Sequence, residues 1–370
     1  MTRILFVSPT HLPLVVGGGQ IGTHQLGLEL QRRGHTIAVL AGRPARLSFQ
    51  QPVSSDRALG YLSVNAWYAE RWLGEVVDSF RPEVVVVHAH HAETAGWVKA
   101  MLRGTGRLPT ALYLHDVGCA GLAAEYGLSV DAVAGVSRFL VSQARRAGAI
   151  VECIPPLIDR LQYRIRTSRR KVLFVNPVPA KGLDVALYLA EARPDIPFAF
   201  ARCWHIERDA LDTLYDRTRR LGNVELRPPV RDPTGLYCDA RILLAPSRYP
   251  EGWARVVTEA QMSGIPAIAT RLGGLPEAVG EGGLLVEPED GADAWLEALS
   301  AMWDDDSAYA GFVARAERAG DREALSPTSV VDRFEALLAD ARVRSAGRPA
   351  RPYEQGRAAA SATHSFGTPG

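Results

Sequence analysis

Short apolar runs alternate with amphipathic stretches along most of this chain, and this alternation constrains the fold more than any other feature. The runs of the first half, rich in β-branched residues, are 4–8, 36–40, 84–88, 110–115 and 132–137. The stretches between them, such as 20–33, carry apolar residues at helical spacing. Strands that alternate with helices form a parallel sheet covered by helices. The first half therefore predicts an α/β domain.

The same alternation restarts after residue 170. Its apolar runs are 171–175, 198–201, 224–227, 242–245, 267–270 and 284–286. A chain of 370 residues has room for two hydrophobic cores. We therefore predict two Rossmann-like parallel-sheet domains that face each other across a cleft, with boundaries at 1–160 and 161–325.

The segments outside the two alternations have simpler compositions. Residues 154–159 contain two prolines and precede the basic stretch 164–171, which indicates a linker; an anionic partner for the basic residues is the less favoured alternative. Ser326 and Pro327 are typical of a helix start, and apolar residues follow at helical spacing, so we predict a helix over 326–343. Residues 344–370 are poor in apolar side chains and are predicted to be disordered.

The bulk charge and the cysteines exclude several classes of function. The formal net charge is +1, from 42 basic and 41 acidic residues, so no overall field attracts nucleic acid or a membrane surface. The four cysteines show no C-x-x-C spacing, which argues against a zinc site or a redox pair and fits a reducing cytoplasm. No apolar run approaches the roughly 18 residues of a membrane-spanning helix.

Two glutamates flank the start of a predicted helix. Glu251 and Gly252 follow the apolar run 242–245, and Glu259 lies about 10 Å further along the helix at roughly 1.5 Å per residue. The backbone amides of 252–256 would lack helical partners and would suit a diphosphate. Taken singly, either acid could instead be a helix-dipole partner or a solvated surface residue.

The surrounding residues resemble the donor-binding half of glycosyltransferase family 4, whose members are retaining GT-B enzymes that use sugar nucleotides. The motif is Glu251-x7-Glu259 followed by Gly273-Gly274-x-Pro-Glu277; the match is close over 242–288 and looser over 3–340. The resemblance implies that Glu251 contacts the donor sugar and Glu259 the ribose hydroxyls. It also implies that the late helix crosses back to the first domain.

The resemblance assigns further residues. It implies that Gly18 and Gly19 approach the diphosphate, that His115 bonds a sugar hydroxyl and that Lys181 neutralises the leaving phosphates. Pro177 stands where the family carries a phosphate-binding arginine, and Arg202 or Arg255 is a hypothetical substitute. The predicted catalytic residues are His115, Lys181 and Glu251. The predicted donor-binding residues are Gly18, Gly19, Asn176, Lys181, Arg202, Val230, Glu251, Gly252, Trp253, Ala254, Arg255, Val256 and Glu259.

Three other patterns suggest different chemistry. Residues 17–22 spell G-x-G-x-x-G, but residues 9–16 separate them from the preceding strand and no acid ends the second strand, so dinucleotide binding is disfavoured. The histidines of 88–91, with His115 and Asp116, suggest a metal, but alternating strand residues face opposite ways and no second cluster completes a tetrahedral set. The aspartates of 304–306 are read as a solvated turn. We therefore expect no metal and no cofactor beyond the sugar nucleotide.

Together these features predict a retaining transferase that moves a hexose-type sugar from a nucleoside diphosphate to the hydroxyl of a small-molecule or glycan acceptor. A nucleotide-sugar epimerase and a non-catalytic sugar-nucleotide-binding protein are the alternatives. Peripheral membrane contact stays open, although no exposed amphipathic helix stands out. The sequence specifies neither the base, the sugar, the acceptor nor the oligomeric state; base choice is expected to depend on the loop near Val230.

Overall fold

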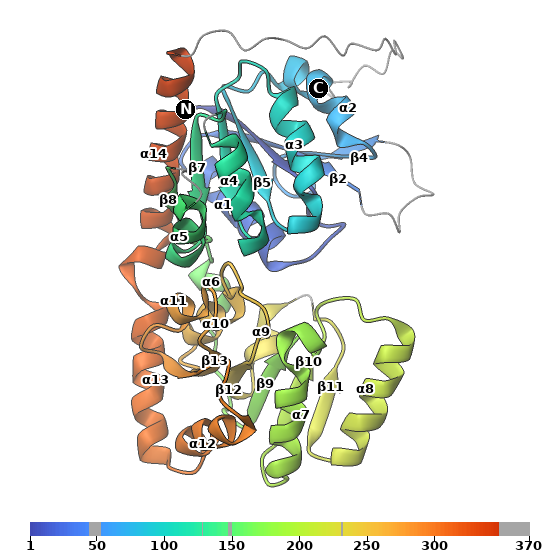
Figure 1. The fold of residues 1–370 in the computed structure, drawn as a ribbon, viewed down its shortest axis with the longest axis vertical. Helices are drawn as coiled ribbons and strands as arrows, with labels where there is room; N and C mark the ends of the chain where they lie inside the picture. Colours follow the sequence, from blue (N-terminus) through green and yellow to red (C-terminus); the bar gives the residue numbers. More distant parts are fainter. Residues whose placement is uncertain (44–52, 128, 147–149, 231, 348–370) are drawn as a thin grey trace.

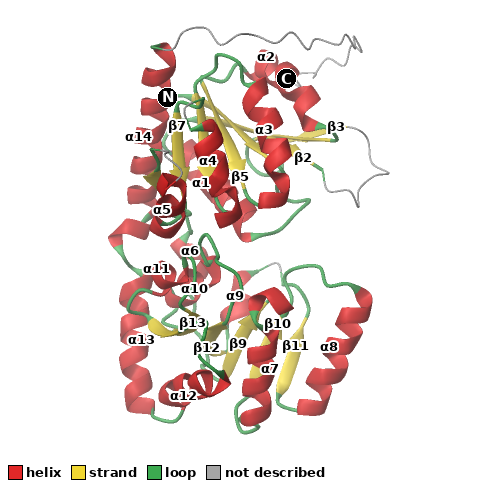
Figure 2. Cartoon of the chain, in the orientation of Figure 1, coloured by secondary structure: helices red, strands yellow, loops and turns green. Residues whose placement is uncertain are grey.

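The computed structural model describes residues 1–43, 53–127, 129–146, 150–230 and 232–347. It contains two sheets, one in each half of the chain, and each is flanked by helices (Figures 1 and 2). The predicted class, two Rossmann-like parallel sheets, is confirmed. Most of the predicted disordered tail, residues 348–370, lies outside the described residues.

The first sheet has eight strands in the order β3-β4-β2-β1-β5-β6-β7-β8, parallel except for β3 against β4. The strands are β1 (Arg3–Ser8), β2 (Thr36–Gly42), β3 (Val53–Asp56), β4 (Leu62–Ala66), β5 (Val84–Ala89), β6 (Thr110–Leu114), β7 (Ala132–Gly135) and β8 (Glu152–Cys153). The helices are α1 (Gly18–Arg32), α2 (Ala69–Phe80), α3 (Ala95–Gly104), α4 (Ala120–Tyr126) and α5 (Arg138–Arg146). Every residue of β5, β6 and β7 is buried, as expected for a parallel sheet covered on both faces.

Three strands of this sheet, β3, β4 and β8, were not predicted. In β4 the polar side chains of Ser63 and Asn65 are buried, with Asn65 Nδ2 3.3 Å from Ser63 Oγ. Strand β8 has two residues, too few for any periodicity. None of these three strands has the continuous apolar run by which the others were identified.

The second sheet has six parallel strands in the order β11-β10-β9-β12-β13-β14. They are β9 (Lys171–Val175), β10 (Phe198–Ala201), β11 (Val224–Arg227), β12 (Ala240–Ala245), β13 (Ala267–Thr270) and β14 (Gly283–Val286). The helices after the connecting helix α6 (Arg160–Tyr163) are α7 (Leu183–Ala192), α8 (Arg208–Leu221), α9 (Pro233–Tyr237), α10 (Arg255–Gln261), α11 (Leu275–Val279), α12 (Ala292–Trp303) and α13 (Asp306–Gly320).

The last helix, α14 (Pro327–Ala346), returns to the first half and runs beside its sheet (Figure 1). Ser326 Oγ caps it by accepting from Ser329 N at 3.1 Å. Its apolar side chains join the core of the first half, where Phe334 packs edge-on against Phe6 with ring centroids 6.2 Å apart. The helix extends past the predicted end at residue 343. No helix among the described residues is long and apolar enough to cross a membrane.

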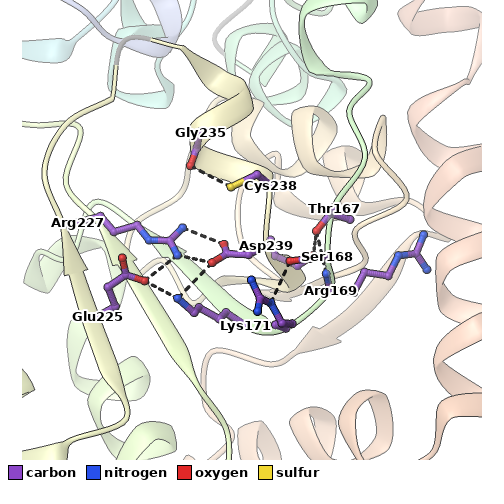
Figure 3. A network of polar contacts seen from close by, with 11 residues as sticks. Thr167, Ser168, Arg169, Lys171, Glu225, Arg227, Gly235, Cys238 and Asp239 are labelled. Carbon is purple, nitrogen blue, oxygen red and sulfur yellow. Dashed lines mark hydrogen bonds and ion pairs between the residues drawn. The ribbon is translucent and has the colours of Figure 1, made fainter.

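A network of charged side chains fixes the start of the second sheet (Figure 3). Arg227 pairs with Asp239, which also lies 3.2 Å from Lys171 Nζ, and both lysine and arginine reach Glu225. Burial opposes ionisation of Asp239, but the hydrogen bonds and charges of Arg227 and Lys171 together outweigh it and lower the pKa of that carboxyl. The end of the basic stretch 164–171 is thus held by acids of its own half.

Candidate active site

The strand ends of the second sheet bring Lys181 and Glu251 together. Strands β9 and β12 are neighbours, so the turn that ends with Lys181 lies beside the loop that follows β12. Lys181 Nζ is 2.8 Å from Glu251 Oε2, and Ser247 Oγ donates to the other carboxylate oxygen. The side chains of Lys181 and Glu251 are 13% and 11% exposed. The predicted catalytic lysine and glutamate therefore form one nearly buried ion pair.

Two aromatic rings surround Lys181. Its Nζ lies 5.0 Å from the ring centroids of Trp204 and Tyr249. Burial would lower the pKa of Lys181, but attraction to Glu251 and Tyr249 outweighs burial and raises it. Lys181 is therefore a fixed positive charge. It retains N–H donors beyond the one used by Glu251.

Glycines allow the loop of Glu251 to pack closely. A Cβ on Gly252 would lie 2.0 Å from the carbonyl oxygen of His115, so this turn meets the first half backbone to backbone. Gly273 adopts φ +62°, and a Cβ there would lie 2.6 Å from the backbone N and O of Glu251. Residues that follow strands of both sheets, His115 after β6 and Gly252 after β12, are thus in contact.

The start of α10 differs in part from the expected array of free amides. The helix begins at Arg255, and the amide of Arg255 donates to the carbonyl of Trp253 at 3.1 Å. The amide of Arg255 thus has a partner just before the helix, and the amides of 252–256 are not all free to bind a diphosphate. Ala254 is 2% exposed, and Val256 is half-buried, while the indole of Trp253 lies 3.2 Å from Thr258 Oγ1.

Glu259 is buried and has protein partners on both oxygens. Its Oε2 accepts from the hydroxyl of Tyr237 at 2.8 Å, and its Oε1 accepts from Arg255 Nε at 3.2 Å. Its side chain is 8% exposed. Glu259 is therefore a carboxylate oriented by two hydrogen bonds, and not a solvated surface acid.

Arg202, Asn176 and Val230 are the remaining predicted residues of the second half, and the first two contact other groups of the same half. Arg202 Nε donates to the carbonyl of Arg227, and its guanidinium stacks 5.7 Å from the ring of Tyr215. Asn176, at φ +60°, accepts the amides of Cys203 and Trp204 at 3.0 and 2.8 Å. Val230 is 38% exposed on the loop after β11.

Three histidines gather at the strand ends of the first sheet. His88 Nδ1 is 3.0 Å from His115 Nε2, and the rings of His90 and His115 are 4.5 Å apart. Gln20 Nε2 lies 3.1 Å from His90 Nδ1, and a Cβ on Gly19 would touch the His90 ring at 3.2 Å. Burial, with repulsion from His91 and Arg255, lowers the pKa of His115 to about 3. These imidazoles are therefore neutral hydrogen-bonding groups.

The geometric argument against a histidine metal cluster is wrong on one point. His88 and His90 are two residues apart, so they lie on the same face of the strand, and with His115 they offer three ligand nitrogens within 4.8 Å of one another. Asp116 is turned to the backbone, where its carboxylate accepts from Gly118 N at 2.8 Å. His88 Nδ1, His115 Nε2 and His90 Nδ1 have the neighbours given above, whereas the buried His88 Nε2 has no hydrogen-bond partner among the described residues.

The remaining patterns have structural explanations. Asp304 pairs with Arg193, Asp305 caps α13, and Asp306 pairs with Arg241, as a solvated acidic turn would. The glycines of 17–22 begin α1 after a loop and do not follow β1 directly. Sequence reasoning missed Trp204, Tyr237, Ser247 and Tyr249. Trp204 and Ser247 shortly follow predicted strands, so the strand-end rule could have found them.

Comparisons with known proteins agree with this architecture. Residues 16–160 match the model described as Glycosyltransferase Family 4, and residues 169–305 match the model described as Glycosyl transferases group 1. Over 180 residues, 43% of this chain, the sequence is 33% identical to a D-inositol 3-phosphate glycosyltransferase of Corynebacterium aurimucosum. Over 90 residues, 24% of this chain, it is 42% identical to the protein of the same description from Corynebacterium efficiens.

A solved structure shows the same fold. Anabaena Alr3699/HepE in complex with UDP-glucose superposes with a TM-score of 0.73 at 15% identity, covering 92% of this chain and all of that one. The matches to the curated relatives span 42% and 20% of those proteins' own lengths. The two family models together cover most of the chain, and the residues between them, 161–168, lie between the last strand of the first sheet and the first strand of the second. The chain therefore belongs to the group 1 and family 4 glycosyltransferases of GT-B architecture.

Proposed function

We propose that this protein is a retaining glycosyltransferase that moves a hexose-type sugar from a nucleoside diphosphate to an acceptor hydroxyl. The observation that carries the proposal is the nearly buried pair of Lys181 and Glu251 at 2.8 Å, beside the motif shared with the family. A cation and a carboxylate fixed side by side suit a ligand in which phosphate oxygens adjoin sugar hydroxyls.

The two side chains divide the chemistry. Lys181 stabilises the negative charge that develops on the departing diphosphate, because its charge is already in place before reaction. Glu251 accepts hydrogen bonds from hydroxyls of the sugar through the lone pairs that Lys181 and Ser247 leave free. His115, neutral and in backbone contact with Gly252, donates or accepts a hydrogen bond to the same sugar. No covalent attack by a carboxylate is required.

The donor and the acceptor are proposed by class. The curated relatives are described as acting on an inositol phosphate, and the solved neighbour binds UDP-glucose, so UDP sugars are the first donors to test. A small polyol or a glycan is the proposed acceptor, and metal ions are proposed not to be required.

Thermal unfolding of the whole chain with UDP, GDP, ADP and dTDP sugars tests donor binding, since a ligand of the native state raises the melting temperature. Turnover is then measured with the donor that binds, with and without acceptors and with EDTA. Release of nucleoside diphosphate that requires an acceptor supports the proposal. Conversion of the donor alone would identify an epimerase, and binding without turnover across many acceptors would identify a binding protein; either result overturns it.

A further inference from the structure

Arg255 lies where both halves of the chain and their connecting segment meet. Its side chain is 6% exposed and makes hydrogen bonds to three different elements. Nε donates to Glu259 Oε1 at 3.2 Å, Nη2 to Gln25 Oε1 of α1 at 2.9 Å, and Nη1 to the carbonyl of Leu157 at 2.7 Å. One guanidinium thus joins the second half, the first half and the connecting segment.

The surface of α1 is shaped to receive this side chain. Gly18, Gly22 and Gln25 follow one another at spacings of four and three residues, so they lie on one face of the helix. A Cβ on Gly18 would lie 3.1 Å from Arg255 Cδ, and one on Gly22 would lie 3.1 Å from Arg255 Nη1. Two glycines of the run 17–22, Gly18 and Gly22, therefore leave space for an arginine from the other half.

On its other side, Arg255 orients the carboxylate of Glu259. Arg255 Nε binds one oxygen of this carboxylate and the Tyr237 hydroxyl binds the other. The carboxylate, which also interacts with the hydroxyl of Tyr163, keeps lone pairs beyond those that accept from Arg255 and Tyr237, so it can accept hydrogen bonds from the ribose. Because both charges of the pair are nearly buried, removing the arginine leaves an uncompensated and disoriented acid.

We propose that Arg255 is a positioning residue that orients Glu259 toward the ribose diol of the donor. Because Arg255 also binds Gln25, this orientation depends on the contact between Arg255 and α1. The inference rests on the proposed function. It replaces the hypothesis that Arg255 binds phosphate, because its hydrogen bonds point it toward α1 and Glu259. Coupling of this kind is reciprocal, so a bound ribose also favours the contact between Arg255 and α1.

The test compares the dissociation constants of UDP and 2′-deoxy-UDP, measured by calorimetry on the full chain. Arg255→Met is expected to weaken UDP binding about tenfold, the loss of a charge-assisted hydrogen bond, and 2′-deoxy-UDP binding by about twofold or less. Gln25→Leu, which leaves the ion pair intact, is expected to weaken UDP binding about threefold. The double variant should resemble Arg255→Met alone, because both changes act through one carboxylate.

Arg322 provides a matched control. It also makes three hydrogen bonds, to the carbonyls of Ala319, Glu277 and Ala278, but it does not touch Glu259. Arg322→Met should lower the melting temperature and leave the ratio of the UDP and 2′-deoxy-UDP constants unchanged. If Arg255→Met weakens both nucleotides equally, or if Gln25→Leu leaves UDP affinity unchanged, the inference is wrong while donor binding by the wild type still stands. Failure of the wild type to bind any of UDP, GDP, ADP and dTDP would instead overturn the proposed function.

Discussion

The two halves supply opposite kinds of side chain to the place where they meet. The first half offers neutral imidazoles at the ends of β5 and β6, whereas the second half offers the ion pairs Lys181–Glu251 and Arg255–Glu259. Burial suppresses charge where no counterion is present and preserves it where one is. The difference indicates that charged parts of a ligand belong to the second half and that the first half contributes neutral hydrogen bonds.

Removing the carboxylate of the second half should have the largest effect. Glu251→Gln is expected to lower kcat/KM about a hundredfold, because a neutral amide no longer complements Lys181 and loses the charged bonds to the sugar. Steady-state kinetics with the best donor provide the measurement. Glu287→Gln, which removes an acid from the half-exposed pair with Arg271, is the matched control. Near-normal turnover of Glu251→Gln would break the comparison.

Two lysines of the second half separate the site from the scaffold. Lys181→Met is expected to weaken binding of a nucleoside diphosphate about thirtyfold, through loss of a charge-assisted contact to phosphate. Lys171→Met disturbs the network of Figure 3, and should lower the melting temperature while leaving nucleotide affinity unchanged. Calorimetric titration of both variants makes the distinction. Equal affinities would show that Lys181 is a structural residue like Lys171.

The neutral first half predicts a pH dependence of stability. The ordinary histidine pKa is 6.5, and burial lowers the pKa of His115 and of His11 to about 3. Between these values the unfolded state binds more protons, so the free energy of unfolding should fall as the pH falls from about 6.5 towards 3. Denaturant unfolding at several pH values measures the slope, and His115→Asn should reduce it. A slope unchanged in this variant would contradict a neutral His115.

The smallest effect should come from an exposed ion pair close to the site. Arg248 and Asp184 pair with side chains that are 48% and 63% exposed. Arg248→Ala is expected to change the free energy of unfolding by about 0.5 kcal/mol or less, since water screens such pairs. Urea unfolding provides the measurement. If Arg248→Ala lowers the free energy of unfolding as much as Lys171→Met does, exposure does not distinguish the weak ion pairs from the strong ones.

The strands that form the sheet centres were predictable because their periodicity is local. Runs such as 84–88, with four valines before His88, and 242–245 are rich in apolar residues because both faces of the sheet are covered, and they lie in β5 and β12. Strand β4 was not predicted because polar residues interrupt its apolar ones. The buried Asn65 is accommodated there by polar contacts, among them one from Arg43 Nε, which donates to the Asn65 carbonyl at 3.0 Å. A polar residue in a strand indicates burial only when its partners are known.

The candidate site was predictable as a set of strand-end positions but not as a set of contacts. Lys181 and Glu251 were chosen separately, and their pairing depends on β9 and β12 being neighbours. A metal site at His88 and His90 was disfavoured because alternating strand residues face opposite ways, but residues two apart lie on the same face of a strand. The role of Gly22 required knowledge of what fills the space beside it.

The sequence by itself determined two parallel sheets, the turns that follow their strands and the Glu251-x7-Glu259 motif, because each depends on residues close together in the chain. The tertiary structure alone decided that Arg255 meets Gln25 and that Gly252 meets His115. Such contacts join residues far apart in sequence, and their distances follow from how two cores pack and not from any local pattern.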